Sequence, residues 1–147
     1  MTKAARFDCE MRIMMPATLD AIEEFFVEFR RRGQTMLDRR NCFSAELLVR
    51  EAMTNAVMHG CGADPGKQVR CALRLRGNRL FIAVSDDGDG FDWRAARNTA
   101  AKDLAEKDLD SSGRGIEILY QYADRVRYSD KGNAVTMIKR FDGGKRS

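Results

Sequence analysis

The sequence is poor in the residues that mark secreted, membrane-spanning and zinc-binding proteins. Its 147 residues include two prolines, one histidine and four cysteines, which are Cys9, Cys42, Cys61 and Cys71. Because no two cysteines form a C-x-x-C pair, a structural zinc site is disfavoured. The longest uninterrupted apolar run, residues 80–84, is far too short to cross a bilayer, and residues 1–10 lack the apolar core of a signal peptide. We therefore expect a cytoplasmic protein with reduced cysteines and no membrane contact.

Charges of the two signs are nearly balanced and interleaved. The chain has 26 Lys and Arg against 22 Asp and Glu, a net charge of +4 at pH 7. With 44% hydrophobic and 33% charged residues, the composition is typical of a globular protein and too apolar for a disordered one. The arginines at 30–32 and 39–40 fall short of a basic stripe, so we expect no direct nucleic-acid contact. The length fits a single domain over residues 1–147.

Two amphipathic helices are predicted in the first half of the chain. The first covers residues 19–32, after Thr18 as a cap and before Gly33 as a stop. Its apolar positions recur at helical spacing and are Ile22, Phe25, Phe26 and Phe29. The second covers residues 43–58 and has one buried stripe, made of Ala45, Leu48, Val49, Ala52, Met53, Ala56 and Val57. Both helices therefore have one face to pack against a sheet.

Alternating apolar and polar residues predict the strands of that sheet. They fall at residues 7–14, 68–76, 80–85, 125–128 and 134–141. A glycine-containing turn at residues 111–115 leads into a predicted helix at 116–122, and residues 93–108 have too poor an apolar face for more than a mobile flap. This order of elements predicts an α+β, two-layer sandwich, with helices on one face of a mixed, mostly antiparallel sheet.

The second helix carries a polar stripe beside its buried one. Glu51, Asn55 and His59 are spaced i, i+4, i+8 and so share one side of the helix. A carboxylate and an amide one turn apart could serve a hard cation such as magnesium, or one magnesium ion and one attacking hydroxyl. The alternatives are a solvated polar flank and, for His59, a cap on the helix C-terminus.

A second polar segment follows the strand at 80–85. Asp86, Gly88 and Gly90 form a D-x-G-x-G pattern, which places an acceptor beside a backbone that can turn sharply and approach a ligand closely. Such a carboxylate can accept a hydrogen bond from an exocyclic amine, although the pattern also fits an ordinary acidic turn. An EF-hand is excluded, because the position that needs a glutamate is Ala96.

A third segment opens the last predicted helix with Gly113, Arg114 and Gly115. Backbone N–H groups at a helix N-terminus suit phosphate, and an arginine would add a charge-assisted contact. Glycines also precede many helices that bind nothing. The sequence has no P-loop, no G-x-G-x-x-G fingerprint and no G-x-S-x-G elbow.

Together, in this order, the three segments resemble the GHKL ATPases, which share the Bergerat nucleotide-binding fold. The segment from Glu51 through Asn55 to Gly60 is similar to their N box, the Asp86 segment to their G1 box, and Gly113-x-Gly115 to their G2 box. Within that superfamily the chain resembles the small anti-sigma-factor serine/threonine kinases of the RsbW and SpoIIAB type, over residues 7–141.

The resemblance implies a role for each motif residue. Asn55 would hold magnesium that bridges the phosphates of ATP, and Glu51 would be the general base that takes the proton from an acceptor hydroxyl. Asp86 would bind the adenine amine in a loop that Gly88 and Gly90 shape. The phosphates would contact Gly113, Arg114 and Gly115, under a lid formed by residues 93–112.

The resemblance also implies a function. The chain would be an ATP-dependent serine/threonine protein kinase and anti-sigma factor, which phosphorylates a STAS-domain anti-anti-sigma partner, binds a sigma factor and forms a homodimer. The main alternative is a nucleotide-switched regulator that binds its partner without phosphotransfer. Two further alternatives are ATP hydrolysis with water as the acceptor, and a metal-binding protein that uses His59 and the aspartate loop.

Overall fold

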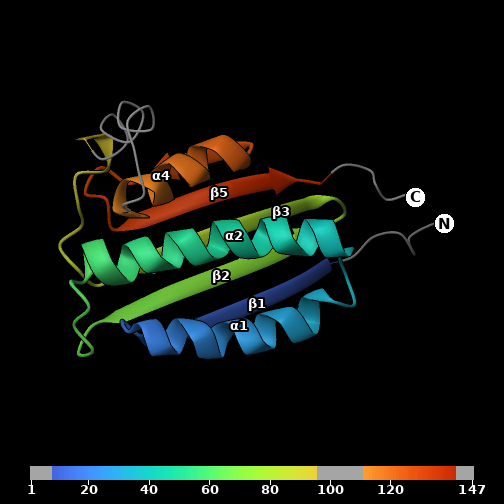
Figure 1. Ribbon diagram of the computed structural model, residues 1–147, viewed down its shortest axis with the longest axis horizontal. Coiled ribbons are helices and arrows are strands. Elements are labelled where there is room, and N and C mark those ends of the chain that lie inside the picture. Colours follow the sequence, from blue (N-terminus) through green and yellow to red (C-terminus); the bar gives the residue numbers. More distant parts are fainter. Residues whose placement is uncertain (1–7, 96–110, 142–147) are drawn as a thin grey trace.

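A computed structural model describes residues 8–95 and 111–141, with only the backbone described for Asp8 and for residues 111–115 (Figure 1). The elements follow the order β1 (Asp8–Pro16), α1 (Leu19–Gly33), α2 (Arg39–Asn55), η2 (Ala56–Gly60), β2 (Gln68–Arg76), β3 (Arg79–Asp86), α4 (Ser111–Tyr122), β4 (Arg125–Tyr128) and β5 (Ala134–Arg140). Most of the expected flap, residues 96–110, lies outside the described residues. Within the described ranges, no helix combines the length and apolar character that a membrane crossing requires.

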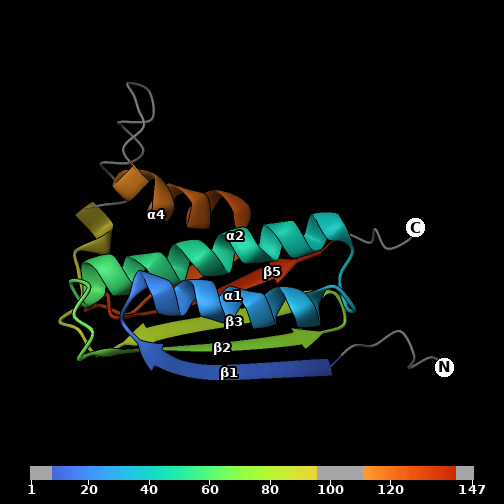
Figure 2. The ribbon, with the colours of Figure 1, turned by 60° about the horizontal axis from the view of Figure 1, so that its bottom comes forward.

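The five strands form one sheet in the order β1-β2-β3-β5-β4. Each neighbouring pair of described strands is antiparallel, so the expectation of a mixed sheet was wrong. Strands joined by tight turns, such as β2 and β3 around Gly77, pair in this way because a short connection reverses the chain. The three helices α1, α2 and α4 lie together on one side of the sheet (Figure 2). The two-layer α+β fold is confirmed.

Helix α1 forms as its sequence predicts. The Oγ1 of Thr18 accepts a hydrogen bond from the Ala21 N–H at 3.1 Å and caps the first turn. The four apolar positions expected to face inward are all buried; they are Ile22, Phe25, Phe26 and Phe29.

Helix α2 starts earlier than predicted, at Arg39 rather than at residue 43. The carboxylate of Asp38 accepts a hydrogen bond from the Asn41 N–H at 2.8 Å, and this cap extends the helix by a turn. The predicted stripe is buried throughout, from Ala45 to Val57. The last turn, however, widens into the π-helical η2.

Helix α4 also differs from expectation, because Ser111–Gly115 is its first turn and not a turn that precedes it. Two glycines in five residues disfavour a helix by about 1 kcal/mol each. Burial of Ile116 and Leu119, together with packing of α4 against α2, outweighs that penalty.

The α1–α2 contact joins an aromatic cluster to a chain of ion pairs. Phe26 is fully buried, with its ring edge-on to those of Phe25 and Phe29 at 4.9 and 5.2 Å between centroids. The guanidinium of Arg50 lies 4.5 Å from the Phe26 ring centroid and pairs with Glu23 at 2.5 Å. This arrangement fixes α2, which carries the first polar motif, against α1.

We expect Phe26→Ala to lower the free energy of unfolding by about 3–5 kcal/mol, because it leaves a cavity where the ring packs. Val27→Ala, at a neighbouring side chain that is 67% exposed, should change it by about 0.5 kcal/mol or less. Denaturant titration measures both. Equal effects of the two substitutions would contradict this account of the core.

Candidate functional site

The three polar motifs meet at one end of the molecule. In both ribbon views, the end of α2, the end of β3 and the start of α4 lie at the left-hand end (Figures 1 and 2). Segments far apart in the sequence therefore surround one place, on the helix-covered side of the sheet.

Asp86 is the last residue of β3 and is only 6% exposed. Its Oδ1 accepts a hydrogen bond from the Gly88 N–H at 2.8 Å. Burial raises the pKa of the Asp86 carboxyl, and the Gly88 N–H and the nearby Cys61 thiol partly oppose that rise. No described cation forms an ion pair with this carboxylate, so it keeps acceptor capacity for a donor from a ligand.

Two glycines allow the backbone to close around Asp86. A Cβ on Gly60 would lie 2.5 Å from the Asp86 Oδ2, and a Cβ on Gly88 would collide with the Gly60 carbonyl oxygen. The end of η2 and the turn after β3 are therefore in direct backbone contact. Any side chain at either glycine would push them apart.

The π-helical turn η2 brings Gly60 to this contact. In η2 the Cys61 N–H donates to the Ala56 carbonyl at 2.9 Å, one residue further back than in an α-helix. The wider turn buries Val57 and Gly60 while it leaves His59 exposed. Single π-helical turns in α-helices are frequent at functional sites.

Asn55 and Tyr128 are buried polar groups without partners. They are 5% and 7% exposed, and neither the Asn55 Nδ2 nor the Tyr128 hydroxyl has a hydrogen-bond partner among the described residues. Burial raises the pKa of Tyr128, and the neighbouring Asn55 amide opposes that rise. Both residues, together with Asp86 and Phe91, line a small cavity of about 10 Å³. Unsatisfied buried groups of this kind fit a polar ligand that enters the cavity.

Aromatic rings border the same cavity. Phe91 stacks on His59 at 5.6 Å and meets the Tyr128 ring edge-on at 5.7 Å. Trp93 stacks on Tyr128 at 5.3 Å, and its indole N–H donates to the Ser129 carbonyl at 3.0 Å. His59 thus contacts a ring. Among the described residues, no group of three His, Cys, Asp or Glu side chains could hold a metal ion.

Glu51 lies one helical turn before Asn55 on α2 and is half-buried. Burial raises the pKa of Glu51, and the adjacent Arg50 opposes that rise. Arg50 itself is engaged with Glu23 and Glu46. No described residue forms a hydrogen bond with the Glu51 carboxylate, so it is available to accept a proton. Glu51 does not line the cavity of Asn55 and Asp86.

The remaining predicted residues border this end of the molecule. Gly113, Arg114 and Gly115 belong to the first turns of α4, which begins at Ser111. Gly90 has a φ of +85°, and a Cβ there would collide with the Lys131 carbonyl oxygen. The loop after β3 therefore packs tightly on the β4–β5 turn.

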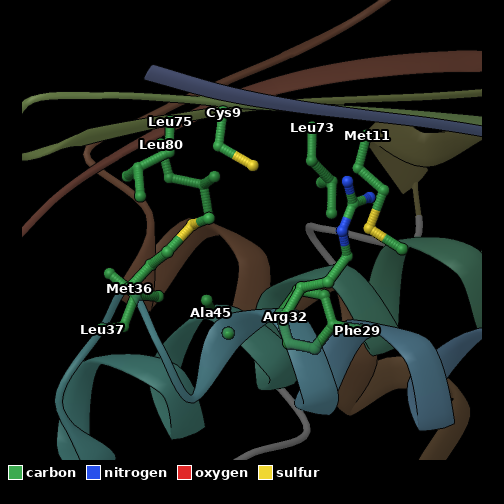
Figure 3. A pocket seen from close by; sticks show the side chains of 11 residues that line it. Cys9, Met11, Phe29, Arg32, Met36, Leu37, Ala45, Leu73, Leu75 and Leu80 are labelled. Carbon is green, nitrogen blue, oxygen red and sulfur yellow. The ribbon is translucent and has the colours of Figure 1, made fainter. Parts of the chain in front are cut away.

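A larger cavity lies elsewhere and differs in character. It has a volume of about 50 Å³ and lies between the strands and the end of α1 with the turn after it, where Met36 and Leu37 face Leu75 and Leu80 (Figure 3). Its lining is apolar except for Arg32, so it offers no set of donors and acceptors for a polar ligand.

Tyr128 and Phe91 were not predicted as site residues. The alternation of β4 puts Tyr128 on the helix side of the sheet, which is the only signal that the sequence holds for it. Its position beside Asn55 depends on how α2 packs over the sheet, and no local pattern encodes that packing.

Comparison with known proteins finds a matching family and curated relatives. Residues 15–139 match the histidine kinase-like ATPase domain. The chain is 31% identical over 103 residues to the anti-sigma F factor of Pasteuria penetrans, which covers 67% of each protein.

Two further relatives have similar names. The anti-sigma F factor of Anoxybacillus flavithermus is 29% identical over 93 residues, which are 63% of this chain and 62% of the relative. The serine-protein kinase RsbW of Bacillus licheniformis is 33% identical over 98 residues, which are 64% of this chain and 61% of the relative. The matched part thus spans less than two thirds of these two proteins.

These matches confirm the resemblance drawn from the three motifs. The family match extends from the end of β1 to the end of β5 and so includes the elements that carry the three motifs. The chain belongs to the family of histidine kinase-like ATPase domains.

Proposed function

We propose that this chain is an ATP-dependent serine/threonine protein kinase that acts as an anti-sigma factor. Its substrate would be a STAS-domain anti-anti-sigma protein, and it would also bind a sigma factor. The names of the relatives, anti-sigma F factor and serine-protein kinase RsbW, support this proposal. Membership of an ATPase family supports ATP as the nucleotide.

One observation supports the nucleotide site: the buried carboxylate of Asp86, which forms no ion pair with a described residue, borders the cavity that is also lined by Asn55 and Tyr128 with their unpartnered Nδ2 and hydroxyl groups. Asp86 would accept a hydrogen bond from the exocyclic amine of adenine, and Gly88 and Gly90 would shape the loop around the base. A ligand amine would compensate the burial of this charge, which the free protein leaves incompletely balanced.

Asn55 fits a role in binding magnesium, because it is buried, lines the cavity and carries an amide oxygen, a ligand type that magnesium accepts. The amide oxygen would hold the ion. When bound, magnesium neutralises charge on the phosphates.

The other motif residues would act on the phosphates and on the acceptor. Gly113, Arg114 and Gly115, at the N-terminal end of α4, would contact the phosphates. Glu51 would accept the proton of the acceptor hydroxyl, since it is half-buried and unpaired within the described chain. The resemblance also supports a homodimer, which light scattering of the purified chain tests.

We expect Asp86→Asn to weaken ATP binding by about tenfold or more, because the adenine amine loses a charged acceptor. The variant should fold, since the amide oxygen can still accept from the Gly88 N–H. Its unfolding midpoint at pH 7 should equal or exceed the wild-type value, because the raised pKa of Asp86 means that the buried charge is a cost at this pH.

The control is Asp87→Asn, the adjacent carboxylate, which pairs with Arg70 at the surface. Calorimetric titration with ATP should show nearly unchanged affinity for this variant. A similar loss of ATP affinity in Asp86→Asn and Asp87→Asn would exclude Asp86 as the acceptor for the adenine amine.

Asn55→Ala should abolish the dependence of nucleotide affinity on magnesium, because the proposed ligand for the ion is removed. ATP titrations with magnesium and with EDTA measure this dependence in wild type and variant. In the variant the two titrations should coincide. A magnesium effect that persists at its full size would exclude Asn55 as the ligand.

Glu51→Gln should reduce phosphate transfer to a STAS-domain protein by about 10²–10⁴-fold and leave ATP binding intact. Glu24→Gln, at an exposed position on α1, is the control. Labelled ATP and candidate STAS-domain proteins provide the assay. If Glu51→Gln transfers phosphate as fast as wild type, Glu51 is not the base. If wild type binds ATP but transfers no phosphate, the nucleotide-switched regulator is favoured.

The pH profile gives a second readout for Glu51. Because burial raises its pKa, the carboxylate protonates at a higher pH than the usual value of about 4.3. The acid limb of the transfer rate should therefore lie above that value.

A further inference from the structure

The sheet has one face that no described element covers. Helices α1, α2 and α4 pack on the other side (Figure 2). Because side chains alternate along each strand, the residues next in sequence to the buried ones point to this open face. The strand register then decides which of them stand side by side.

Arginine dominates the open face. The eight arginines at outward positions are Arg12, Arg70, Arg74, Arg76, Arg79, Arg125, Arg127 and Arg140. The outward acidic positions in the same strands are Asp8 and Glu10, both on the edge strand β1. The whole chain has a net charge of only +4, so this face is more basic than the protein as a whole.

Two of these arginines have acidic partners near the rim of the face. Arg12 pairs with Glu10 at 3.0 Å and Arg70 with Asp87 at 2.7 Å. Five others are exposed and form no ion pair or side-chain hydrogen bond with a described residue; these are Arg74, Arg79, Arg125, Arg127 and Arg140. Each of their guanidinium groups is available to an acidic partner.

The register also sets like charges directly opposite each other. Arg79 on β3 faces Arg76 on β2 and Arg140 on β5. Like charges in such cross-strand pairs destabilise a sheet. An anionic partner over this row would relieve the repulsion.

The middle of the face is apolar. One cross-strand row runs from Glu10 on the edge strand through Arg74, Phe81 and Ile138 to Arg125. Within it, two half-buried apolar side chains lie between two exposed arginines. The next row places Ala72 beside Ala83. An apolar centre with an arginine-rich rim is typical of protein interfaces.

We propose that this open face binds a protein partner whose acidic side chains surround an apolar patch. Nucleic acid fits less well, because phosphates would leave the apolar centre bare and Phe81 is the only aromatic residue at the outward positions of the described strands. A second copy of the same face carries charge of the same sign and would be repelled. The face lies opposite the helix layer, so its test is independent of the nucleotide site.

Binding of a fluorescent copolymer of glutamate and tyrosine to the full chain tests the proposal. Arg74→Glu combined with Arg125→Glu should weaken binding by about tenfold or more, equal to about 1.4 kcal/mol. Arg39→Glu combined with Arg40→Glu, which makes the same change of charge at exposed positions on α2, should bind like wild type.

Three results would overturn the proposal. The first is equal binding by the two double variants. The second is tighter binding of a DNA duplex that carries the same number of charges as the copolymer, which would assign the face to nucleic acid. The third is light scattering that shows a dimer for wild type and a monomer for the variant with Arg74→Glu and Arg125→Glu, which would assign the face to a second copy of the chain.

A separate variant tests the effect of the like-charge pairs on stability and on binding together. Arg79→Glu replaces a like-charge pair with an opposite-charge pair against Arg140, so its thermal unfolding midpoint should rise while copolymer binding weakens. A lower midpoint, or unchanged binding, would contradict the argument from register.

Discussion

The contact between two glycine backbones around the carboxylate of Asp86 is the constraint on which the candidate site depends. Gly60 ends the π-helical turn and Gly88 follows β3, and no Cβ could be added at either without a clash. This approach buries Asp86 and aims the turn after β3 toward Gly60. Burial of the carboxyl group raises the pKa of Asp86. Because the charged form is disfavoured in the folded state, the folded state becomes less stable, relative to the unfolded state, as pH rises through that pKa. A structural role alone would favour a neutral residue here, whereas the proposed adenine amine would give the carboxylate a partner.

The helix layer gives this contact its position. Helix α2 must keep its register over the sheet for Asn55 to reach the cavity with Tyr128. The aromatic cluster under α1 holds that register through apolar burial, since exposed ion pairs such as Arg50 with Glu23 contribute about 0–1 kcal/mol each. The Nδ2 group of Asn55, which has no hydrogen-bond partner among the described residues, is thus held in place by this packing. Groups held in this way are prepared for a ligand at a cost to the free protein.

Local periodicity explains what could be predicted from the sequence. The buried stripe of α2, the face of α1 and the strands from β2 to β5 depend on spacing within one segment, and these predictions agree with the structure. The motif residues Asn55 and Asp86 were expected to share a site, and they line one cavity. The failures are of another kind. The π-helical turn before Gly60, the early start of α4 and the place of Tyr128 all depend on packing between segments, which no local pattern contains.

The fold presents two surfaces with opposite chemistry. On the helix side, a buried carboxylate and a buried amide border one small cavity, while the open sheet face carries five exposed arginines that form no ion pair with a described residue. The most direct test of the central claim is calorimetric titration of the purified chain with ATP and with GTP, both with magnesium. The account predicts that ATP binds and that GTP binds much more weakly, because guanine presents a carbonyl oxygen to Asp86 where adenine presents an amine. Absence of ATP binding, or equal affinity for the two nucleotides, would contradict it.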